Sequence, residues 1–578
     1  MTHERTGADL IVSIIQKYTN RIFVYPGGTV APVIDSAVQN GMQLITARTE
    51  QGAGFAAIGA AKLNSAAEVI LVSSGPGVTN LVTCIADSYF DSVPVVAICG
   101  QVGQSDYKGN KPIRQGGFQE VDTASIMSKI AKKVFTPQSL SELSSNLEEA
   151  FLISTAGRPG PVVLDLHMNL QREVLIELPK LADSFILPEL AEDNLIEGTA
   201  VSHVIEMLVE CERPLIIAGA GALNLETSKL IKEFSFLTGI PVTQSLHSLG
   251  ILDSCNPLSL GFHGHTGERK SGFAIQNSDL ILILGSRLDI RQTGTMVNDF
   301  APNATKIRID IDRNEIEYSR IKIDISINSS VKRFMEELVA HFPIDRDWYH
   351  SEWSAQLSSL QEAHNNESSL RRKTTSLPEV NPYNVIRQIG EIFSNQQVNV
   401  VTGVGSHQQW VAREFLFDFP RTRWFTSGGL GTMGYDLPVS IGASIADQGR
   451  ETLCFVGDGS FQMNIQELAF AREMNAAVKI IVLDNNRLGI VSQFQNMNWA
   501  SDPTCGSKFN PDFAAIATAY GIPSRSISSD SDVPEAIRWL HDQPGPLLLH
   551  VHISPSLDIV PMLLAGDTMD KMWPYDGS

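Results

Sequence analysis

Leu453-Cys454-Phe455-Val456-Gly457-Asp458-Gly459-Ser460 joins an apolar run to a glycine-rich turn, and this pattern decides the fold class of the chain. The apolar run predicts a buried strand, and the glycines allow a ligand to approach the backbone closely. Ser460 is suited to cap a following helix. A second apolar run at 478–483 ends in polar residues that include Asn485. In a strand–helix–strand unit of a parallel sheet, both strand ends lie at the edge where ligands bind.

Asp458 and Asn485 offer a carboxylate oxygen and an amide oxygen, which are the hard ligands that Mg²⁺ prefers. Mg²⁺ usually takes one or two ligands from a protein and the others from water and phosphate. The stretch therefore predicts a magnesium diphosphate site. A bare Gly-Asp-Gly is more often a polar turn after a buried strand, so the second strand end carries much of the argument.

The Gly-Asp-Gly turn and the later Asp484-Asn485 pair together resemble the motif of thiamine diphosphate (ThDP) enzymes, with Asp484 in place of the usual first Asn. The resemblance implies that Asp458, Asn485 and the main-chain carbonyl of Arg487 bind Mg²⁺. It also implies cofactor contacts for the other residues of the turn, namely Gly457, Gly459 and Ser460.

Length and composition place the chain among large globular proteins. At 578 residues it is long enough for about three or four domains. A formal net charge of −20 argues against nucleic acid or an anionic membrane as a partner, but not against a diphosphate, whose charge Mg²⁺ neutralises. No apolar run approaches the ~20 residues of a membrane span, the N-terminus lacks a signal-peptide pattern, and the cysteines lack metal-site spacing. These features predict a cytoplasmic protein with reduced cysteines.

Apolar strands alternate with helices through most of the chain, which predicts an α/β fold with parallel sheets covered on both faces. We expect three doubly wound parallel-sheet domains, which by resemblance are the pyrimidine-binding, middle and diphosphate-binding domains of ThDP enzymes. Linker-like segments at 176–190 and 344–380 separate them. The predicted units are residues 1–175, 191–343 and 381–553, followed by a tail, 554–578, that folds over the site as a lid or frays.

Glu50 begins a predicted helix directly after a strand, in Arg48-Thr49-Glu50-Gln51. An acidic residue in a first turn often does no more than favour the helix dipole. However, the segment resembles the Arg-His-Glu-Gln of ThDP enzymes, and the likeness continues through Ser74–Asn80. In that family the Glu binds N1′ of the aminopyrimidine, which lets the 4′-nitrogen remove the C2 proton of the thiazolium. A buried Glu with a raised pKa suits this role.

Further catalytic candidates come from Gly116-Gly117-Phe118-Gln119-Glu120, which resembles the Ala-Phe-Gln-Glu of acetolactate synthases. In that family the Phe and the Gln face the reacting carbon. Lys132 matches a basic position of the family, and Gly28 follows the predicted strand at 21–25. The loop 103–115 is longer than the usual one, and it is either a specificity loop or a tolerated surface insertion.

The middle region contains features suited to a nucleotide. Gly219 and Gly221 follow a predicted strand, but the full GxGxxG motif is absent, which disfavours a nicotinamide site. Arg287 and Arg291 lie on a loop after a strand and suit phosphates, while Asp310 ends another strand and suits a ribose or an adenine. These segments resemble the FAD-binding segments of acetolactate synthases and imply FAD in a structural role. The usual Asp before the second Arg is missing, and relatives hold CoA, ADP or nothing here.

The third region contains two more glycine-rich segments. Gly405-Ser406-His407 resembles the segment that binds the diphosphate, with Ser in place of the usual Gln. Ser427–Gly434 closely matches another family segment, in which the carbonyl of Gly431 accepts from the 4′-amino group and Met433 wedges between the two cofactor rings. Without this likeness, Met433 would be assigned to core packing.

The resemblance covers all three regions and is specific to acetolactate synthases (acetohydroxyacid synthase large subunits). It implies a carboligase that decarboxylates pyruvate and transfers the two-carbon acetyl unit to a second carbonyl compound. Three departures fall on the acceptor side: Thr49 replaces a usual His, Phe494 replaces a usual Trp, and the 103–115 loop is long. We assign Thr49 and Phe494 to the acceptor pocket. The three departures leave open a second activity, acetyl transfer to a keto-sugar nucleotide in branched-chain (yersiniose-type) sugar synthesis.

Two alternative functions belong to other classes of protein. A non-catalytic ThDP-fold binding protein is disfavoured by the intact Glu50, Asp458 and Asn485. A nicotinamide oxidoreductase is disfavoured by the incomplete glycine motif. By resemblance, Glu50 and the diphosphate site come from different subunits, which implies a homodimer or homotetramer with active sites at the subunit interface.

Overall fold

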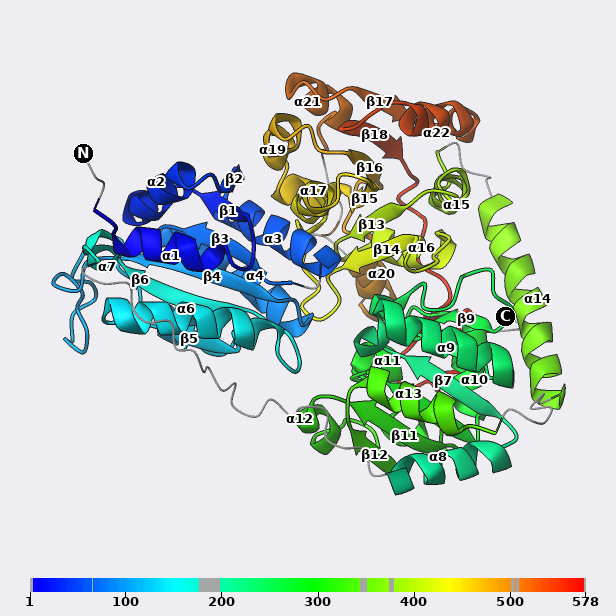
Figure 1. Ribbon diagram of the computed structural model, residues 1–578. Coiled ribbons are helices and arrows are strands. Elements are labelled where there is room, and N and C mark those ends of the chain that lie inside the picture. The colour runs from blue at the N-terminus through cyan, green and yellow to red at the C-terminus, as the bar shows by residue number, and fades with distance from the viewer. Residues whose placement is uncertain are drawn as a thin grey trace.

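The computed structural model contains three α/β domains, each built on a six-stranded sheet whose strand pairs are all parallel (Figure 1). The predicted fold class is therefore confirmed. The predicted linker at 176–190 and parts of the linker at 344–380 lie outside the described residues. The structure describes residues 4–64, 66–175, 198–343, 351–373, 379–499, 505 and 509–575.

The N domain (residues 4–175) has the strand order β2-β1-β3-β4-β6-β5. Its central strand β3 has only buried residues, as its run of apolar side chains leads us to expect. The strands are β1 (Arg21–Tyr25), β2 (Gln43–Thr46), β3 (Glu68–Val72), β4 (Val95–Gln101), β5 (Lys133–Phe135) and β6 (Val162–His167). The helices are α1 (Gly7–Ile15), η1 (Gly28–Val30), α2 (Ala31–Gln39), α3 (Glu50–Asn64), α4 (Pro76–Phe90), α5 (Thr123–Met127), α6 (Leu140–Thr155) and α7 (Met168–Arg172).

The C domain (residues 379–553) repeats this order as β14-β13-β15-β16-β18-β17. In both domains the order reverses between the first and third strands, so the crevice for a ligand lies at their carboxyl ends. The strands are β13 (Val398–Thr402), β14 (Thr422–Thr426), β15 (Glu451–Gly457), β16 (Val478–Asp484), β17 (Ser524–Ile527) and β18 (Leu547–His552). The helices are α15 (Pro382–Ile392), α16 (Ser406–Glu414), α17 (Asp436–Ala446), α18 (Asp458–Met463), α19 (Glu467–Glu473), α20 (Gly489–Asn498), α21 (Phe513–Ala519), η5 (Asp530–Asp532) and α22 (Val533–Asp542).

The M domain (residues 198–343) differs, with the order β9-β8-β7-β10-β11-β12. This is the 3-2-1-4-5-6 order of dinucleotide-binding sheets, whose crevice lies between the first and fourth strands, β7 and β10. The strands are β7 (Pro214–Ala218), β8 (Val242–Gln244), β9 (Ser259–Phe262), β10 (Leu280–Leu284), β11 (Thr305–Asp310) and β12 (Ile325–Asn328). The helices are α8 (Gly198–Glu210), η2 (Ala220–Ala222), α9 (Leu225–Thr238), η3 (Leu246–Ser248), α10 (Arg269–Asn277), α11 (Ile290–Thr293), η4 (Val297–Asp299), α12 (Arg313–Glu317) and α13 (Val331–His341).

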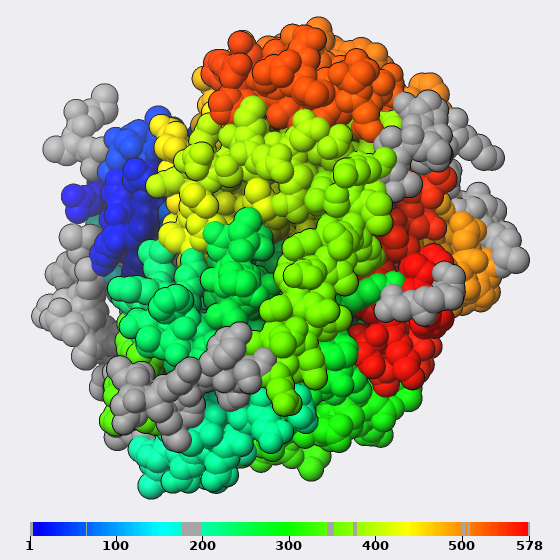
Figure 2. Space-filling view, turned by 90° about the vertical axis from the view of Figure 1, so that its right-hand side faces the viewer, coloured from blue at the N-terminus to red at the C-terminus, as the bar shows by residue number. Residues whose placement is uncertain are grey.

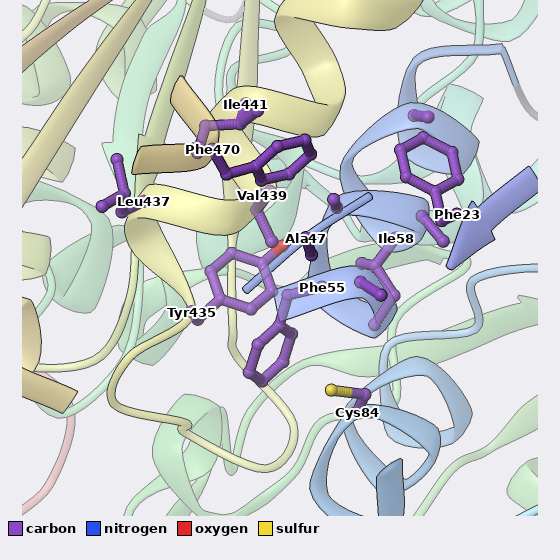
Figure 3. Packing of buried hydrophobic residues seen from close by; sticks show 14 of the residues in the cluster. Phe23, Ala47, Phe55, Ile58, Cys84, Tyr435, Leu437, Val439, Ile441 and Phe470 are labelled. Atoms are coloured by element: carbon purple, nitrogen blue, oxygen red, sulfur yellow. The ribbon is translucent and has the colours of Figure 1, made fainter. Parts of the chain in front are cut away.

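The N and C domains share one hydrophobic core, in which α3 packs against α17. Figure 3 shows Phe55 of α3 facing Tyr435, and their rings meet edge to face with centroids 5.5 Å apart. Two glycines let the helix backbones touch, because a Cβ at Gly59 or Gly442 would lie 2.1 Å or 1.8 Å from a carbonyl oxygen of the other helix. Helix α3 is buried on nearly every side by this packing.

In the described part of the chain, no helix is long and apolar enough to cross a membrane.

Gly442→Ala tests this contact. The new methyl group would collide with the main-chain oxygen of Ala56, which cannot move without shifting α3. We expect a loss of about 1–3 kcal/mol in the free energy of unfolding, measured by urea denaturation. Gly198→Ala is the matched control, because a Cβ at Gly198 meets no atom within 4 Å. Equal denaturation midpoints for the two variants would contradict the close helix contact.

The long helix α14 (Ser351–Lys373) and the C-terminal tail bind the M and C domains together, and they lie side by side in Figure 2. The tail forms a small hairpin of β19 (Met562–Leu563) and β20 (Met572–Trp573). Met569 and Met572 are buried in a core of the M domain, and Arg269 donates to the carbonyl oxygen of Met572 at 2.6 Å. Residues 554–575 are thus docked and not frayed. A lid role for the tail stays a prediction.

Candidate active site

The carboxyl ends of β13 and β15 are adjacent and bring together the residues predicted to bind the diphosphate. His407, at the start of α16, has Nε2 3.0 Å from Oδ1 of the buried Asp436. Asp436 also accepts a hydrogen bond from the hydroxyl of Ser460. The other ring nitrogen, Nδ1, faces the glycines, since Cβ atoms at Gly405 and Gly457 would lie 2.8 and 3.0 Å from it. Asp436 therefore fixes the imidazole with Nδ1 toward the strand ends.

Two further glycines let side chains pack closely on the backbone at this edge. A Cβ at Gly489 would lie 2.5 Å from Oγ of Ser406 and 2.7 Å from Nδ2 of Asn485. A Cβ at Gly459 would lie 3.4 Å from the terminal methyl of Met433. Gly431, two residues before Met433, has φ +71°, a left-handed value that favours glycine. The structure thus brings the predicted cofactor-binding residues of the C domain to one edge of its sheet.

Asp458 begins α18, and its carboxylate is buried beside a second acid. Oδ2 of Asp458 accepts from Nδ2 of Asn510 at 2.7 Å, and the same amide donates to Oδ1 of Asp484 at 2.8 Å. Burial raises the pKa of Asp458 to about 6, with the charge of Asp484 acting in the same direction and the Asn510 hydrogen bond acting against it. A bound divalent cation would stabilise this carboxylate in its charged form.

Asp484 is committed to a different partner. Its Oδ2 accepts from Nε2 of His550 at 2.9 Å. Burial works to raise the pKa of Asp484, but the hydrogen bonds from His550, the N–H of Asn486 and Asn510 lower it below the ordinary value. With Asp484 held in this way, Asp458, Asn485 and the carbonyl of Arg487 remain at this edge to offer oxygen atoms, the ligand type that Mg²⁺ prefers.

The N-domain residues predicted to be catalytic gather at the carboxyl edge of the other sheet. Glu50 begins α3, and its Oε2 accepts from Nδ2 of Asn80 at 2.9 Å. Gln119 has φ +63°, which is uncommon for a residue other than glycine, and its Cβ lies 2.9 Å from where a Cβ would stand at Gly75. Such backbone strain is frequent at functional sites. Because Phe118 is 85% exposed and Glu50 is only half-buried, this edge is open to solvent in a single chain.

Gly28 lies at the same edge, at the start of η1 and directly after β1. A Cβ at Gly28 would meet no atom within 4 Å, so the space beside it is free. The neighbouring Thr29 has its hydroxyl 2.9 Å from that of Ser73, which ties the end of β1 to the end of β3. The position is therefore rigid and accessible, as a contact with a ligand requires.

Lys132 does not join this group. It precedes β5 and so lies at the amino end of the sheet, opposite the edge that carries Glu50. Its Nζ donates to the carbonyl oxygens of Ile153, Ala156 and Arg158 at 2.6, 2.7 and 2.8 Å, which uses all three N–H groups to cap the end of α6. Burial lowers the pKa of Lys132 to about 8. The predicted catalytic role is corrected to a structural one.

Thr49 and Phe494, which we predicted to line an acceptor pocket, have different surroundings. The hydroxyl of Thr49 donates to Oε1 of the buried Glu467 at 3.0 Å and accepts from the N–H of Gly52 at 2.9 Å. Phe494 on α20 is 55% exposed and contacts Trp499 edge to face. Thr49 thus caps α3 and joins the N domain to the C domain, while Phe494 is free to contact a ligand.

The M-domain residues predicted to bind a nucleotide surround a cavity of about 370 Å³ at the crevice between β7 and β10. The cavity is lined by residues of all three domains, and its size lies in the range of small-molecule sites. Gly219 lies just beneath it, packed on the backbone of Gly285. Four of the predicted residues line the cavity, namely Gly221, Arg287, Arg291 and Asp310.

The charges of this cavity suit a phosphorylated ligand. Burial lowers the pKa of Arg291, a sign that its charge is poorly compensated, and an anion would relieve this. Burial also raises the pKa of Asp310, against the effect of the adjacent Arg308. His263 and His265 have pKa values lowered to about 4 by burial, so both are neutral at pH 7.

Several acids and one amide of the site were missed from the sequence. Asp436 orients His407, Glu467 holds the start of α3, and Asn510 bridges two carboxylates. Asp87 and Asp91, at the end of α4, bind the Ser427–Gly434 segment from another domain. None of these residues stands in a glycine-rich motif, and their partners lie far away in the chain. Their one shared signal is an acid or amide among apolar or small residues.

Comparison with protein-family models finds three matches in chain order. "Thiamine pyrophosphate enzyme, N-terminal TPP binding domain" matches residues 5–126, "Thiamine pyrophosphate enzyme, central domain" matches residues 201–338, and "Thiamine pyrophosphate enzyme, C-terminal TPP binding domain" matches residues 403–551. Each match falls on one of the three sheets. The resemblance to ThDP enzymes that the motifs indicated is confirmed.

Curated relatives align over nearly the whole chain. The acetolactate synthase isozyme 1 large subunit of Escherichia coli (strain K12) is 35% identical, over 98% of this chain and 97% of the relative. Acetolactate synthase 1, chloroplastic, of Oryza sativa subsp. japonica is 33% identical, over 98% of this chain and 88% of the relative. The mitochondrial acetolactate synthase catalytic subunit of Saccharomyces cerevisiae is 31% identical, over 99% of this chain and 84% of the relative.

Proposed function

The chain belongs to the thiamine pyrophosphate enzyme family, and we propose on this basis that it is an acetolactate synthase-like carboligase. In this proposal it decarboxylates pyruvate and transfers the two-carbon acetyl unit to a second carbonyl compound. The observation that carries the proposal is the convergence of Asp458, Asn485 and His407 at the carboxyl ends of β13, β15 and β16, where glycines let the side chains of His407, Ser406 and Asn485 pack closely on the backbone.

The residues at this edge fit ThDP and Mg²⁺. Asp458, Asn485 and the carbonyl of Arg487 would hold the metal ion, while Ser406 and His407 would bind the diphosphate at the start of α16. ThDP supplies, when bound, an electron sink for the loss of CO₂ from a 2-keto acid. Asp458 is buried beside a second acid, Asp484, and burial raises its pKa, so a divalent cation at this point would stabilise its charged form.

Glu50 would exchange a proton with N1′ of the aminopyrimidine. Its hydrogen bond from Asn80 holds one carboxylate oxygen in place and leaves the other for the ring. Phe118 and Gln119 stand beside it on the same edge, where they would contact the pyruvate carbons and exclude water. Since this edge is open in a single chain, the C domain of a second copy would cover it. We therefore infer a homo-oligomer whose active sites are shared between subunits.

FAD is the nucleotide that we propose for the three-domain cavity. The M sheet has the dinucleotide-binding strand order, and Arg287 and Arg291 provide positive charge for a pyrophosphate. Asp310 ends β11, where a carboxylate suits a ribose or an adenine. The role is structural, because the proposed reaction has no redox step.

A keto-sugar nucleotide remains a second candidate acceptor, and the loop before Phe118 favours it. The loop is firmly held: the carboxylate of Glu120 accepts from the N–H groups of Lys108, Gly116 and Gly117 at 3.0, 2.6 and 3.0 Å. A loop built in this way is suited to present side chains to a ligand. It carries Lys108 at its rim and two exposed cations, Lys111 and Arg114, which would attract a phosphorylated acceptor.

The test is the product formed from ¹³C-labelled pyruvate with ThDP, Mg²⁺ and FAD, followed by NMR. Rapid formation of acetolactate without another acceptor would establish pyruvate in both roles. Slow CO₂ release that accelerates when a keto-sugar nucleotide is added would establish the second candidate. The absence of any CO₂ release from the fully loaded protein would overturn the carboligase and leave a non-catalytic binding protein.

A further inference from the structure

The segment Ser427–Gly434, which carries Gly431 and Met433, is held by side chains of another domain. It follows β14 in the C domain, but its main polar contacts come from Asp87 and Asp91 at the end of α4 in the N domain. In Figure 1 the yellow loop before α17 runs beside the end of α4. The position of this segment therefore depends on how the domains meet.

Asp87 holds the two ends of the segment together. Its Oδ2 accepts from the hydroxyl of Ser427 and from the hydroxyl of Thr432, the latter at 2.7 Å. The hydroxyl of Ser427 in turn accepts from the N–H of Thr432 at 2.8 Å. Burial and the charge of Asp91 raise the pKa of Asp87 to about 6, against the charge of Lys62. The turn that presents Gly431 is thus closed around one buried carboxyl group.

Asp91 holds the start of the segment. Its Oδ1 accepts from the N–H of Gly429 at 2.8 Å, and its Oδ2 from the N–H of Gly428 at 3.3 Å. Two basic side chains face the same carboxylate, with Nζ of Lys62 at 3.3 Å and Nε2 of His247 at 3.1 Å. Burial works to raise the pKa of Asp91, but the neighbouring His247 and Lys62 side chains and the Gly429 N–H hold it well below its usual range.

His247 connects this carboxylate to the three-domain cavity. It lies in η3 of the M domain, and His247, Asp91 and Gly428 all line the cavity. The imidazole packs directly on the segment, since a Cβ at Gly428 would lie 2.0 Å from Nε2 of His247. A ligand in the cavity would therefore touch the same three groups that fix the start of the segment.

We propose that Asp91 and His247 are positioning residues that couple a nucleotide in the three-domain cavity to the placement of Ser427–Gly434, and so to ThDP binding. This rests on the proposed function, because it needs a nucleotide at one site and ThDP at the other. A nucleotide packed against His247 keeps the imidazole between Asp91 and Gly428. Without it, the imidazole can turn into the cavity, and Gly428 loses a packing partner.

Coupling of this kind must be reciprocal: each ligand raises the affinity of the other by the same factor. The test measures the Kd of ThDP, in the presence of Mg²⁺, for the full-length protein with and without saturating FAD. It then measures the Kd of FAD with and without ThDP and Mg²⁺. We expect both affinities to rise by the same factor, about fivefold or more.

His247→Ala should bring this factor to about one while each ligand alone still binds. His247→Gln, which keeps a polar side chain long enough to pack between Asp91 and Gly428, should restore part of it. Asp310→Asn is the matched control, because Asp310 lines the same cavity but accepts its hydrogen bonds from Arg308 and the N–H of Asp312, within its own domain. This variant should weaken FAD binding and leave the coupling factor intact.

The outcomes separate the two claims. Independent binding of FAD and ThDP by the unaltered protein, or an unchanged factor in His247→Ala, would overturn the coupling and leave the proposed function standing. Failure of the unaltered protein to bind either ligand would overturn both. A merely structural role for His247 would weaken both ligands alike and would not remove the factor.

Discussion

Glu50→Gln is expected to lower the turnover of pyruvate by about 100- to 10,000-fold, the usual contribution of a positioned acid–base group. Gln has nearly the shape of Glu and can still accept the hydrogen bond from Asn80, so the fold should be unchanged. It cannot, however, exchange a proton with the aminopyrimidine. The measurement is CO₂ release from pyruvate under saturating ThDP and Mg²⁺, together with the Kd of ThDP.

Glu535→Gln is the matched control. Glu535 also stands in the first turn of a helix, α22, where it pairs with Arg525 on the surface. This variant should keep full turnover. Normal decarboxylation by Glu50→Gln would refute the role assigned to Glu50, whereas a loss of ThDP binding without a change in the turnover of bound enzyme would make Glu50 a binding residue.

Asp458→Asn is expected to weaken Mg²⁺-dependent ThDP binding by at least about 100-fold, since even second-sphere changes cost 10- to 100-fold in metal affinity. The Asn side chain keeps the shape but removes the charge that offsets the cation. Binding is measured by calorimetry at several Mg²⁺ concentrations. Unchanged Mg²⁺-dependent affinity would rule out the metal site described here.

The same variant should stabilise the protein when no cofactor is bound. The pKa of Asp458 in the folded protein, about 6, lies above its ordinary value of 3.8. Folding therefore loses stability as the pH rises from 3.8 to about 6, and the full cost of the charged carboxylate is present above pH 6. Asp458→Asn removes this cost and should raise the urea midpoint of the apoprotein at pH 7 to 8 but not at pH 4. A lower midpoint at pH 7 would show that the carboxylate is not under electrostatic stress.

The parts of the site that were predictable from sequence lie where a parallel sheet places its strand ends. Gly405, Gly457 and Asp458 follow apolar runs, and the reversal of strand order puts these ends side by side whatever the rest of the chain does. The cavity around Arg287 and Arg291 follows the same rule in the M domain. In these cases, local sequence pattern and sheet topology together were enough to predict which residues lie at the site.

The rest could not be read from local pattern, because it depends on contacts between distant segments. Asp87 and Glu467 look like ordinary helix residues until their partners, Ser427 and Thr49, are known. Lys132 was misassigned for a related reason: a matching residue type said nothing about which edge of the sheet it occupied. Thr49 donates to Glu467, a contact that no motif could indicate, and its place in an acceptor pocket stays a prediction.

The packing of α3 against α17 has a consequence for biosynthesis. The ribosome completes α3 at Asn64, but α17 ends only at Ala446, and at 5–20 residues per second the delay is on the order of 20–75 s. Throughout that time, the nascent N domain carries a helix whose residues are nearly all destined for burial. We therefore expect isolated fragments that end before the C domain to aggregate more readily than the full-length chain.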